Sequence, residues 1–317
     1  MWKYIDKKEC NEFLLSLNLI NCKDEKKYIK TLYSISNNVE KNYRKFKIKK
    51  RNGKLRTIYE PNEILKHIQR QILNNILNDR TISKYAKAYQ KGLSLRDNAI
   101  MHTNKDMILK LDIKDFFENI SFVSIYNSCF SIEFFPKSVG MILTYLCTYE
   151  DHLVQGAPTS SYISNLVMRD FDIQLGTWCE NNSISYTRYS DDMTFSGNFN
   201  PSEIIVKVRK MLYKLGLELN NDKIHVVKKS SSQKVTNLVV NEKVQVSSIY
   251  RKKIRQEIYY IKKYGLESHL KKLNIDNKEK YLNILYGKIL FVLQIDDNNL
   301  EFLSHKKFLK ELIKKLK

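Results

Sequence analysis

The 317-residue chain has few of the residues that mark several classes of protein. It contains only 9 glycines and 4 prolines and no linker rich in either, so its domain boundaries must be inferred from changes of pattern. Its five cysteines are scattered without a Cys-x-x-Cys pair, which argues against a zinc site or a disulfide framework and fits a reducing compartment. It lacks a leader-like apolar segment and any apolar run near the ~20 residues of a membrane span, so we expect a cytoplasmic protein with no membrane partner.

Negative charge is also scarce. The chain has 34 acidic against 55 basic residues, a net charge of +21, and this excess points to a polyanion such as a nucleic acid as the partner. A lysine-rich surface that is merely well solvated is the alternative. With 43% hydrophobic residues, the chain can fill the cores of two or three packed subdomains.

Hydrophobic periodicity predicts an α+β chain in three parts. Residues 1–106 contain two short helices and a basic β-hairpin that turns at Asn52-Gly53, a pair suited to the positive φ angles of a tight turn. Residues 107–246 alternate strands with helices, and residues 247–317 show only helical periodicity with many basic residues. In this last part, "SSIYRKKIRQEIYYIKKYG" is expected to be a helix with a Ser cap, a Gly stop and Ile254, Ile258 and Ile261 on one face, and two further amphipathic helices are expected at 278–294 and from 300 to the end.

Three local predictions concern the middle of the chain. The strand at residues 107–113 is expected to lead into a helix that begins near Asp115. The segment "VQGAPTSSYISNLVMRDFDIQLGTWCENN" is expected to form a loop and then one long helix, and "KVTNLVV" a short strand.

The stretch "TRYSDDMTFSG" places two adjacent carboxylates, Asp191 and Asp192, between two strand-like runs. Asp is a favoured turn residue, so simple hairpin chemistry is one interpretation. A metal site is the other, because neighbouring carboxylates repel each other unless a cation neutralises them, and Mg²⁺ prefers oxygen ligands.

A third carboxylate favours the metal. Asp112 lies at the end of an apolar strand, where an unpaired Asp is costly to bury. Capping a following helix is the alternative role, for which Asp115 is better placed. If the strand lies beside the hairpin, three carboxylates meet, enough to hold two Mg²⁺ ions for a phosphoryl transfer.

The loop "QGAPTSS" adds Gly156, whose missing side chain would let a substrate approach the backbone. Alone, this loop is only an entry into a helix. In chain order, however, a strand Asp followed by two aromatics, a Gln-Gly loop before a helix and a Tyr-x-Asp-Asp hairpin together resemble the palm of a reverse transcriptase.

Further motifs resemble one group of these enzymes. "RTIYEPNEILKHIQRQILNNIL" is similar to the opening fingers motif of bacterial reverse transcriptases, and "LELNNDKIHV" to their N-x-x-K segment. "NAIMH" (98–102) and "VTNLVVN" (235–241) are similar to the NAxxH and VTGLVVN elements of retron reverse transcriptases. Three positions depart from the family pattern: Ser190 stands for Ala, Ser161 for Pro and Asn237 for Gly, and Asn tolerates positive φ better than most residues.

The resemblance implies a right-hand polymerase. Its fingers would lie in residues 1–106, its palm of antiparallel sheet and helices in 107–246 with part of the fingers interleaved, and its basic helical thumb in 247–317. The implied catalytic residues and ligands of two Mg²⁺ ions are Asp112, Asp191 and, more weakly, Asp192, with the Ile113 carbonyl as a further ligand.

The resemblance also implies binding residues. The triphosphate would be held by Lys54 and Arg56, the sugar 2′ position would face Phe117, Gln155 and Gly156 would line the nucleotide pocket, and Lys223 would protonate the departing pyrophosphate. A core Phe117 and a merely solvated Lys223 are the alternatives. The implied RNA-binding residues are Asn98, His102, Arg251, Lys252, Lys253, Arg255, Lys262 and Lys263.

The function implied is that of a retron reverse transcriptase. Such an enzyme takes deoxynucleoside triphosphates, uses a structured non-coding RNA as template and as 2′-OH primer, and makes RNA-linked multicopy single-stranded DNA that partners an effector protein encoded nearby in antiphage defence. The alternatives are a reverse transcriptase of the group II intron or diversity-generating type, or a non-catalytic RNA-binding relic of the fold.

Overall fold

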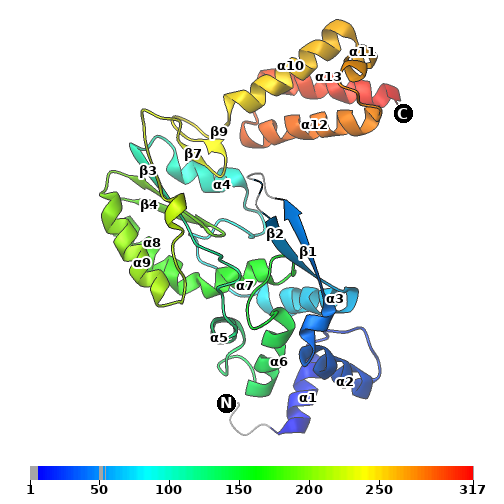
Figure 1. Cartoon of the computed structure of the whole chain (residues 1–317), viewed down its shortest axis with the longest axis vertical. Coiled ribbons are helices and arrows are strands. Elements are labelled where there is room, and N and C mark those ends of the chain that lie inside the picture. The colour runs from blue at the N-terminus through cyan, green and yellow to red at the C-terminus, as the bar shows by residue number, and fades with distance from the viewer. Residues whose placement is uncertain (1–5, 50–52, 54, 317) are drawn as a thin grey trace. The chain divides into compact units, whose positions relative to one another are not determined.

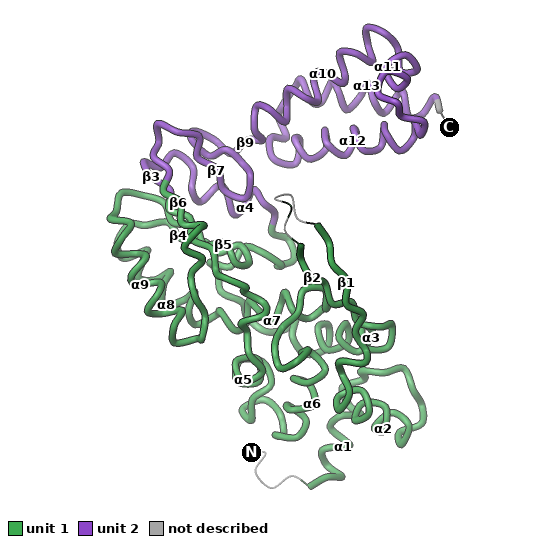
Figure 2. The backbone as a smooth tube through the Cα atoms, in the orientation of Figure 1, with its two compact units in different colours: residues 1–93, 109–226 green, residues 94–108, 227–317 purple. Residues whose placement is uncertain are grey.

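The structure, a computed structural model, describes residues 6–49, 53 and 55–316. The chain forms two compact units (Figure 2): unit 1 comprises residues 1–93 and 109–226, and unit 2 comprises residues 94–108 and 227–317. The division into fingers, palm and thumb at residues 106 and 246 follows function rather than compactness and stays a prediction.

Unit 1 begins with the two predicted helices, α1 (Lys7–Ser16) and α2 (Glu25–Ser36). Helix α1 starts four residues earlier than its apolar pattern, because Asp6 forms a capping box with Glu9. After a short 3₁₀ turn, η1 (Val39–Asn42), the chain enters the basic hairpin.

The hairpin consists of β1 (Tyr43–Lys49) and β2 (Leu55–Pro61), paired antiparallel. Gly53 at its turn has a φ of +82°, as the tight turn requires, whereas Asn52 lies outside the described residues. Helix α3 (Glu63–Ile72) follows and continues as a single π-helical turn, η2 (Leu73–Leu77).

A four-stranded sheet belongs mainly to unit 1 (Figure 1). Its strands are β3 (Met107–Asp112), β4 (Ser185–Tyr189), β5 (Asp192–Gly197) and β6 (His225–Lys228), in the order β4-β5-β3-β6. Strands β4 and β5 form the predicted hairpin, and the order of the sheet sets β5, which begins at the second Asp of the motif, beside β3, which ends at Asp112.

The other helices of unit 1 are α5 (Phe122–Ile125), the π-helical turn η4 (Tyr126–Phe130), α6 (Lys137–Cys147), α7 (Ser160–Val167), α8 (Arg169–Asn181), α9 (Pro201–Tyr213) and the 3₁₀ turn η5 (Asn221–Lys223). Helix α8 packs against strand β4 of the sheet and against α9, whereas α6 packs against the N-terminal helices α1, α2 and α3 (Figure 1).

Two of the local predictions in this region are wrong in detail. No helix begins near Asp115: its φ of +43° is left-handed, residues 114–119 form turns, and the next helix starts at Phe122, capped by Ser121. The long helix is two helices, because a ψ of 0° at Met168 interrupts the regular geometry between α7 and α8.

Unit 2 combines a small sheet with the C-terminal helices. It starts with α4 (Leu95–Ala99) and the 3₁₀ turn η3 (Ile100–His102). Strands β7 (Lys234–Val235), β8 (Leu238–Val239) and β9 (Gln245–Val246) form an antiparallel sheet. The predicted strand "KVTNLVV" is therefore a hairpin, whose turn residues Thr236 and Asn237 both have positive φ, +45° and +66°.

The helices of unit 2 follow the predicted pattern closely. Helix α10 (Ser248–Tyr264) is capped by Ser247 and stopped by Gly265, and its predicted apolar stripe of Ile254, Ile258 and Ile261 is buried. The short α11 (Leu266–Lys272) was not predicted, whereas α12 (Lys278–Ile295) and α13 (Leu300–Leu316) were.

Candidate active site

Backbone hydrogen bonds bring the three predicted carboxylates to one place. The Ile113 N–H donates to the Asp191 carbonyl at 3.0 Å, so the tip of the β4–β5 hairpin lies against the end of β3. On the other side of β3, the Asn220 N–H donates to the Asp112 carbonyl at 2.8 Å. The sequence could predict the three carboxylates but not this pairing, which depends on the order of strands in the sheet.

The Asp112 carboxylate is buried and is held by a lysine. Asp112 is 5% exposed, and Lys223 Nζ lies 2.7 Å from Asp112 Oδ2. Burial lowers the pKa of Lys223, but the hydrogen bond to Asp112 and the nearby negative charges outweigh it, so the pKa of Lys223 is raised. Lys223 is thus a positive charge inside the site.

The two hairpin carboxylates are poorly neutralised. Burial, followed by the charge of Asp112, raises the pKa of Asp191. The Asp192 residue is exposed, yet protein atoms crowd its carboxyl; this desolvation, together with the charges of Asp191 and Asp112, raises the pKa of Asp192 to about 6. An added cation would relieve both shifts.

The donor chemistry fits a divalent cation, although the carboxylates do not enclose one as they stand. Across residues 6–49, 53 and 55–316, no three His, Cys, Asp or Glu side chains converge closely enough to hold a metal ion. Asp112 Oδ2 instead accepts a hydrogen bond from Lys223. Three carboxylates and nearby carbonyls form the oxygen-only set that Mg²⁺ prefers.

A cavity of about 690 Å³ opens beside these carboxylates, and we call it the carboxylate pocket. Its wall combines the β2 strand, the end of β3 with the turns that follow, the Gln155 loop and the hairpin tip. The predicted site residues in this wall are Arg56, Asp112, Ile113, Phe117, Gln155, Gly156, Asp191 and Lys223. Lys54 lies outside the described residues.

Phe117 and its neighbour Phe116 differ in burial. Phe116 is buried in the core and Phe117 is half-buried against it, and both residues line the carboxylate pocket. The sugar-contacting role of Phe117 stays a prediction.

The structure explains why a glycine is required at position 156, which the sequence did not reveal. The Tyr59 N–H donates to the Gln155 carbonyl at 2.9 Å, which attaches strand β2 to this loop. A Cβ on Gly156 would lie 2.5 Å from the Tyr59 carbonyl oxygen, and its φ is +122°. The close approach at this glycine is therefore made by the hairpin backbone.

The predicted RNA-binding residues include buried, partly buried and exposed side chains. Asn98 and His102 are 1% and 0% exposed, so their side chains do not reach solvent. Arg255 forms two hydrogen bonds with Glu301, both at 2.6 Å, and Arg251 donates to Gln245. The lysines at positions 252, 253, 262 and 263 are exposed on α10.

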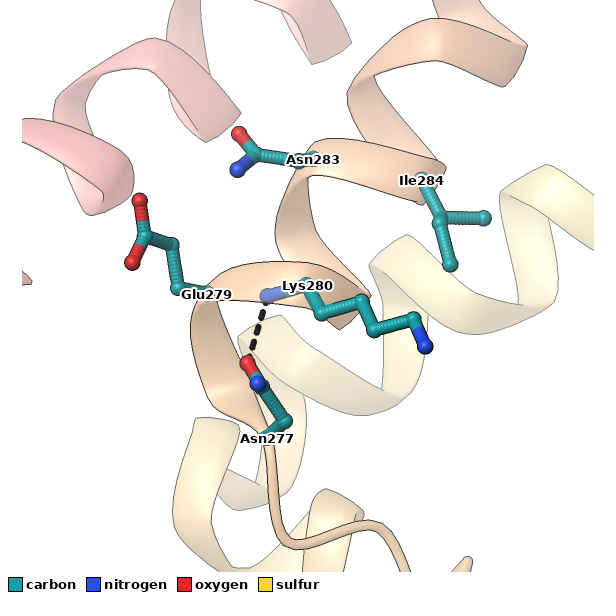
Figure 3. A pocket seen from close by; sticks show the side chains of 5 residues that line it. All are labelled: Asn277, Glu279, Lys280, Asn283 and Ile284. Atoms are coloured by element: carbon teal, nitrogen blue, oxygen red, sulfur yellow. Dashed lines mark hydrogen bonds between the residues drawn. The ribbon is translucent and has the colours of Figure 1, made fainter.

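A hollow of about 520 Å³ lies on unit 2 at the start of α12 (Figure 3). Asn277 there accepts the Lys280 N–H as the helix cap, and Glu279, Asn283 and Ile284 complete the wall. These residues do not form a catalytic grouping, so the carboxylate pocket is the better candidate.

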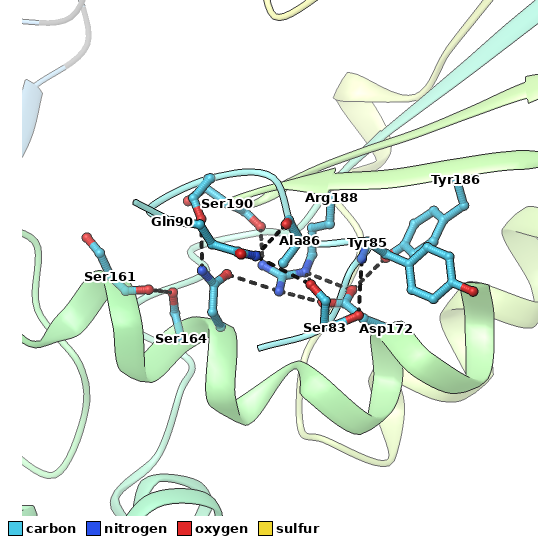
Figure 4. A network of polar contacts seen from close by, with 12 residues as sticks. Ser83, Tyr85, Ala86, Gln90, Ser161, Ser164, Asp172, Tyr186, Arg188 and Ser190 are labelled. Carbon is cyan, nitrogen blue, oxygen red and sulfur yellow. Dashed lines mark hydrogen bonds and ion pairs between the residues drawn. The ribbon is translucent and has the colours of Figure 1, made fainter. Parts of the chain in front are cut away.

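Two residues near the hairpin tip, Tyr89 and Arg188, were not predicted from the sequence. Tyr89 lines the carboxylate pocket and donates its hydroxyl to Ser190 Oγ at 3.2 Å. Arg188, one residue before the Tyr-x-Asp-Asp motif, is fully buried in a polar network (Figure 4). The available signal was the alternation of the strand, which places Arg188 on the same face as Ile184 and Tyr186, both of them buried.

Known proteins resemble this chain over most of its length. The reverse transcriptase (RNA-dependent DNA polymerase) family profile matches residues 48–285. The Retron Ec86 reverse transcriptase of Escherichia coli is 30% identical over 240 residues, 74% of this chain and 74% of that protein. This chain belongs to the retron reverse transcriptases. Retron reverse transcriptases similar to it include Retron Ec83 of Escherichia coli, 30% identical over 87% of this chain and 89% of its own length.

As a reverse transcriptase, the protein is an RNA-directed DNA polymerase of right-hand fold. Retron Mx65 reverse transcriptase of Myxococcus xanthus is 28% identical over 77% of this chain and 62% of its own length. A solved telomerase from Candida albicans overlaps 89% of this chain and 70% of its own at 11% identity, with a TM-score of 0.44. Among the described residues, no helix has the length and apolarity that crossing a bilayer demands.

Proposed function

We propose that this reverse transcriptase makes DNA joined to one specific structured RNA, using that RNA as template and primer. The observation that carries the proposal is the packing of its two retron-type motifs in unit 2. The segment after "NAIMH" meets "VTNLVVN": the Asn104 N–H donates to the Val240 carbonyl at 3.0 Å. Asn241, which ends the second motif, accepts the Gln233 N–H at 2.9 Å and donates to the carbonyls of Lys229 and Ser231.

This packing supports an indirect role for the first motif. Because Asn98 and His102 are buried, they act on RNA by shaping the module rather than by touching it. Exposed groups would contact the RNA directly. Among them are the four exposed lysines of α10, which would bind backbone phosphates, including those of unpaired segments. The protein would act in the cytoplasm, where the RNA and deoxynucleotides are available.

The chemistry begins at a 2′-OH of the bound RNA. Its oxygen attacks the α-phosphorus of a deoxynucleoside triphosphate, loses its proton, forms a 2′,5′ phosphodiester and displaces pyrophosphate. When two Mg²⁺ ions are bound, they supply positive charge at the attacking and leaving oxygens, with Asp112, Asp191 and Asp192 as their protein ligands and the Ile113 carbonyl as a further one.

Residues of the pocket would bind and orient the nucleotide. Arg56 would contact the triphosphate, and Gln155 and Gly156 would form the wall beside it. Phe117 would limit space at the sugar 2′ position. Lys223 would supply the proton for the leaving pyrophosphate once Asp112 is occupied by a cation.

The DNA product would be RNA-linked multicopy single-stranded DNA. Its partner would be an effector protein encoded nearby, acting in defence against phage, and this step rests on the resemblance to the retron family alone.

One experiment tests the priming proposal. The gene is expressed with its upstream region, and extracted nucleic acid is treated with RNase and with a debranching enzyme. We expect a DNA species whose mobility changes on debranching and which is absent from an Asp191→Asn control. DNA that does not respond to debranching, or extension of a generic primer-template without any linked DNA, would assign the enzyme to another kind of reverse transcription.

A further inference from the structure

Arg188 forms a buried ion pair within the hairpin that carries the catalytic motif. Its guanidinium donates three hydrogen bonds to Asp172 of α8, from Nε to Oδ1 at 2.9 Å and to Oδ2 at 3.1 Å, and from Nη2 to Oδ2 at 2.7 Å. Both side chains are completely buried. The Tyr186 hydroxyl donates to Asp172 Oδ1 at 2.8 Å, and Arg188 Nη2 also donates to Asn165 Oδ1 at 3.1 Å (Figure 4).

Stability alone does not account for this pair. Removing two charges from water costs several kcal/mol per ion, and apolar replacements of buried ion pairs are often neutral or stabilising. The cost is offset only when the hydrogen bonds are well formed, as they are here. A packed pair of apolar side chains would fill the same space, so the arginine has a role that packing does not explain.

The third nitrogen of the guanidinium, Nη1, indicates this role. Arg188 Nη1 donates to the Ser190 carbonyl at 2.9 Å. This carbonyl belongs to the peptide that joins Ser190 to Asp191, and Ser190 has a φ of +61°, a conformation unfavourable for a residue with a side chain. The guanidinium therefore connects a helix to the strained turn at the hairpin tip.

The backbone of Arg188 is fixed as well. Its N–H donates to the Tyr85 carbonyl at 2.8 Å and its carbonyl accepts the Lys87 N–H at 2.7 Å, so residues 85–87 lie along the outer edge of β4. The guanidinium thus starts from a rigid position and reaches the turn from the helix side of the strand.

We propose that Arg188 is a positioning residue for polymerisation, which fixes the Ser190–Asp191 peptide so that the Asp191 carboxylate stays beside Asp112. Asp191 is then held on both sides. The peptide before it is held by Arg188, and its own carbonyl accepts the Ile113 N–H from β3. The inference rests on the role of Asp191 as a metal ligand, which is part of the proposed function.

The test compares two variants with a control from the same network. Arg188→Lys keeps a positive charge for Asp172 but cannot reach the Ser190 carbonyl at the same time. The double variant Arg188→Met with Asp172→Leu removes both charges, so that it leaves no unpaired charge of this ion pair in the core. Tyr186→Phe removes one hydrogen bond to Asp172 and leaves the contact with Ser190 intact.

The readouts are Mn²⁺ binding by electron paramagnetic resonance without nucleotide, DNA synthesis, thermal melting and RNA affinity. We expect both Arg188 variants to lose about 10–100-fold in Mn²⁺ affinity and in turnover, the size typical of losing an outer partner of a metal ligand. RNA affinity should stay within about 2-fold of the wild type, because no RNA-contacting lysine is changed. Tyr186→Phe should keep wild-type Mn²⁺ affinity and turnover even if its melting temperature falls.

Two results overturn the inference. One is a folded double variant with wild-type Mn²⁺ affinity and turnover. The other is failure of both Arg188 variants to fold, since the pair would then serve the whole unit rather than the hairpin tip. An active Asp191→Asn enzyme would instead refute the metal assignment, so the two failures are distinguishable.

Discussion

The ammonium of Lys223 lies 2.7 Å from Asp112 Oδ2, and the charges of Asp191 and Asp192 also act to raise the pKa of this lysine. Lys223 therefore compensates part of the negative charge that a divalent cation would otherwise neutralise. The lysine is half-exposed and the Asp is buried, so solvent weakens the pair from one side only. A bound cation and this lysine would compete for the same carboxylate.

We therefore predict that Lys223→Gln makes the protein more dependent on Mg²⁺ for stability. Without Lys223, repulsion among Asp112, Asp191 and Asp192 is less compensated, so a cation that binds the folded state stabilises it more. The Mg²⁺-induced rise in Tm should exceed that of the wild type by about 1–2 °C, a fraction of 1 kcal/mol for a protein of this size. Thermal melting with and without Mg²⁺ measures it.

The matched control is Lys84→Gln. Lys84 pairs with Glu180 at 2.8 Å on the surface of the same unit, away from the carboxylate pocket. It should leave the Mg²⁺-induced rise unchanged. An equal rise in wild type and Lys223→Gln would show that the lysine does not compete with the cation.

Phe117 provides a second prediction, on sugar discrimination. Its half-buried ring lines the carboxylate pocket, so Phe117→Val should open space beside the nucleotide sugar. We expect ribonucleotide incorporation to rise relative to deoxynucleotide incorporation, by about 10-fold or more if one steric contact of 1–3 kcal/mol is lost. Competition between the two nucleotides in primer extension measures the ratio. An unchanged ratio in a folded variant would leave Phe117 with a packing role only.

The sequence predicted the chemistry of this site better than its geometry. Asp112 and the Asp191-Asp192 pair could be identified because carboxylates in or beside apolar strands are unusual. The helices of unit 2 could be predicted because their caps and their apolar stripe are local features of the sequence. The hydrogen bond from Ile113 to Asp191 could not, since it depends on strand order between distant segments. The prediction of a helix at Asp115 was wrong because Asp115 itself adopts a left-handed φ, which does not fit an α-helix.

Gly156 illustrates the same limit and gives the third prediction. An alanine there would bring a Cβ to 2.5 Å from the Tyr59 carbonyl, a backbone atom that cannot easily move, at a φ that disfavours side chains. We expect Gly156→Ala to lower the free energy of unfolding by about 2–4 kcal/mol, combining strain and overpacking, and to reduce DNA synthesis. Denaturant unfolding and primer extension measure the two effects.

Gly216→Ala is the control for backbone strain alone. Gly216 also has a positive φ, +70°, but a Cβ there would meet no atom within 4 Å. Its cost should stay near the 1–2 kcal/mol of a left-handed residue with a side chain. Equal losses for the two variants would mean that contact between the Gln155 loop and β2 contributes little.

The last prediction concerns pH and His305 in helix α13. Burial, opposed by the charge of Glu301, lowers the pKa of His305. Both ring nitrogens are buried and, among the described residues, neither has a hydrogen-bond partner; Nε2 lies 3.6 Å from Glu301, and the ring packs edge-on against Phe302. The folded state therefore favours the neutral imidazole.

The direction of the effect follows from proton binding. An unfolded histidine has a pKa of about 6.5, so just below this pH the unfolded chain binds more protons than the folded one. The contribution of His305 is fully present above about pH 6.5 and is lost as the pH falls toward the lower folded pKa. His305→Gln should therefore reduce the fall in Tm between pH 7.5 and about pH 5.5. If this variant follows the wild-type curve, the imidazole of His305 stays accessible enough to protonate freely in the folded protein.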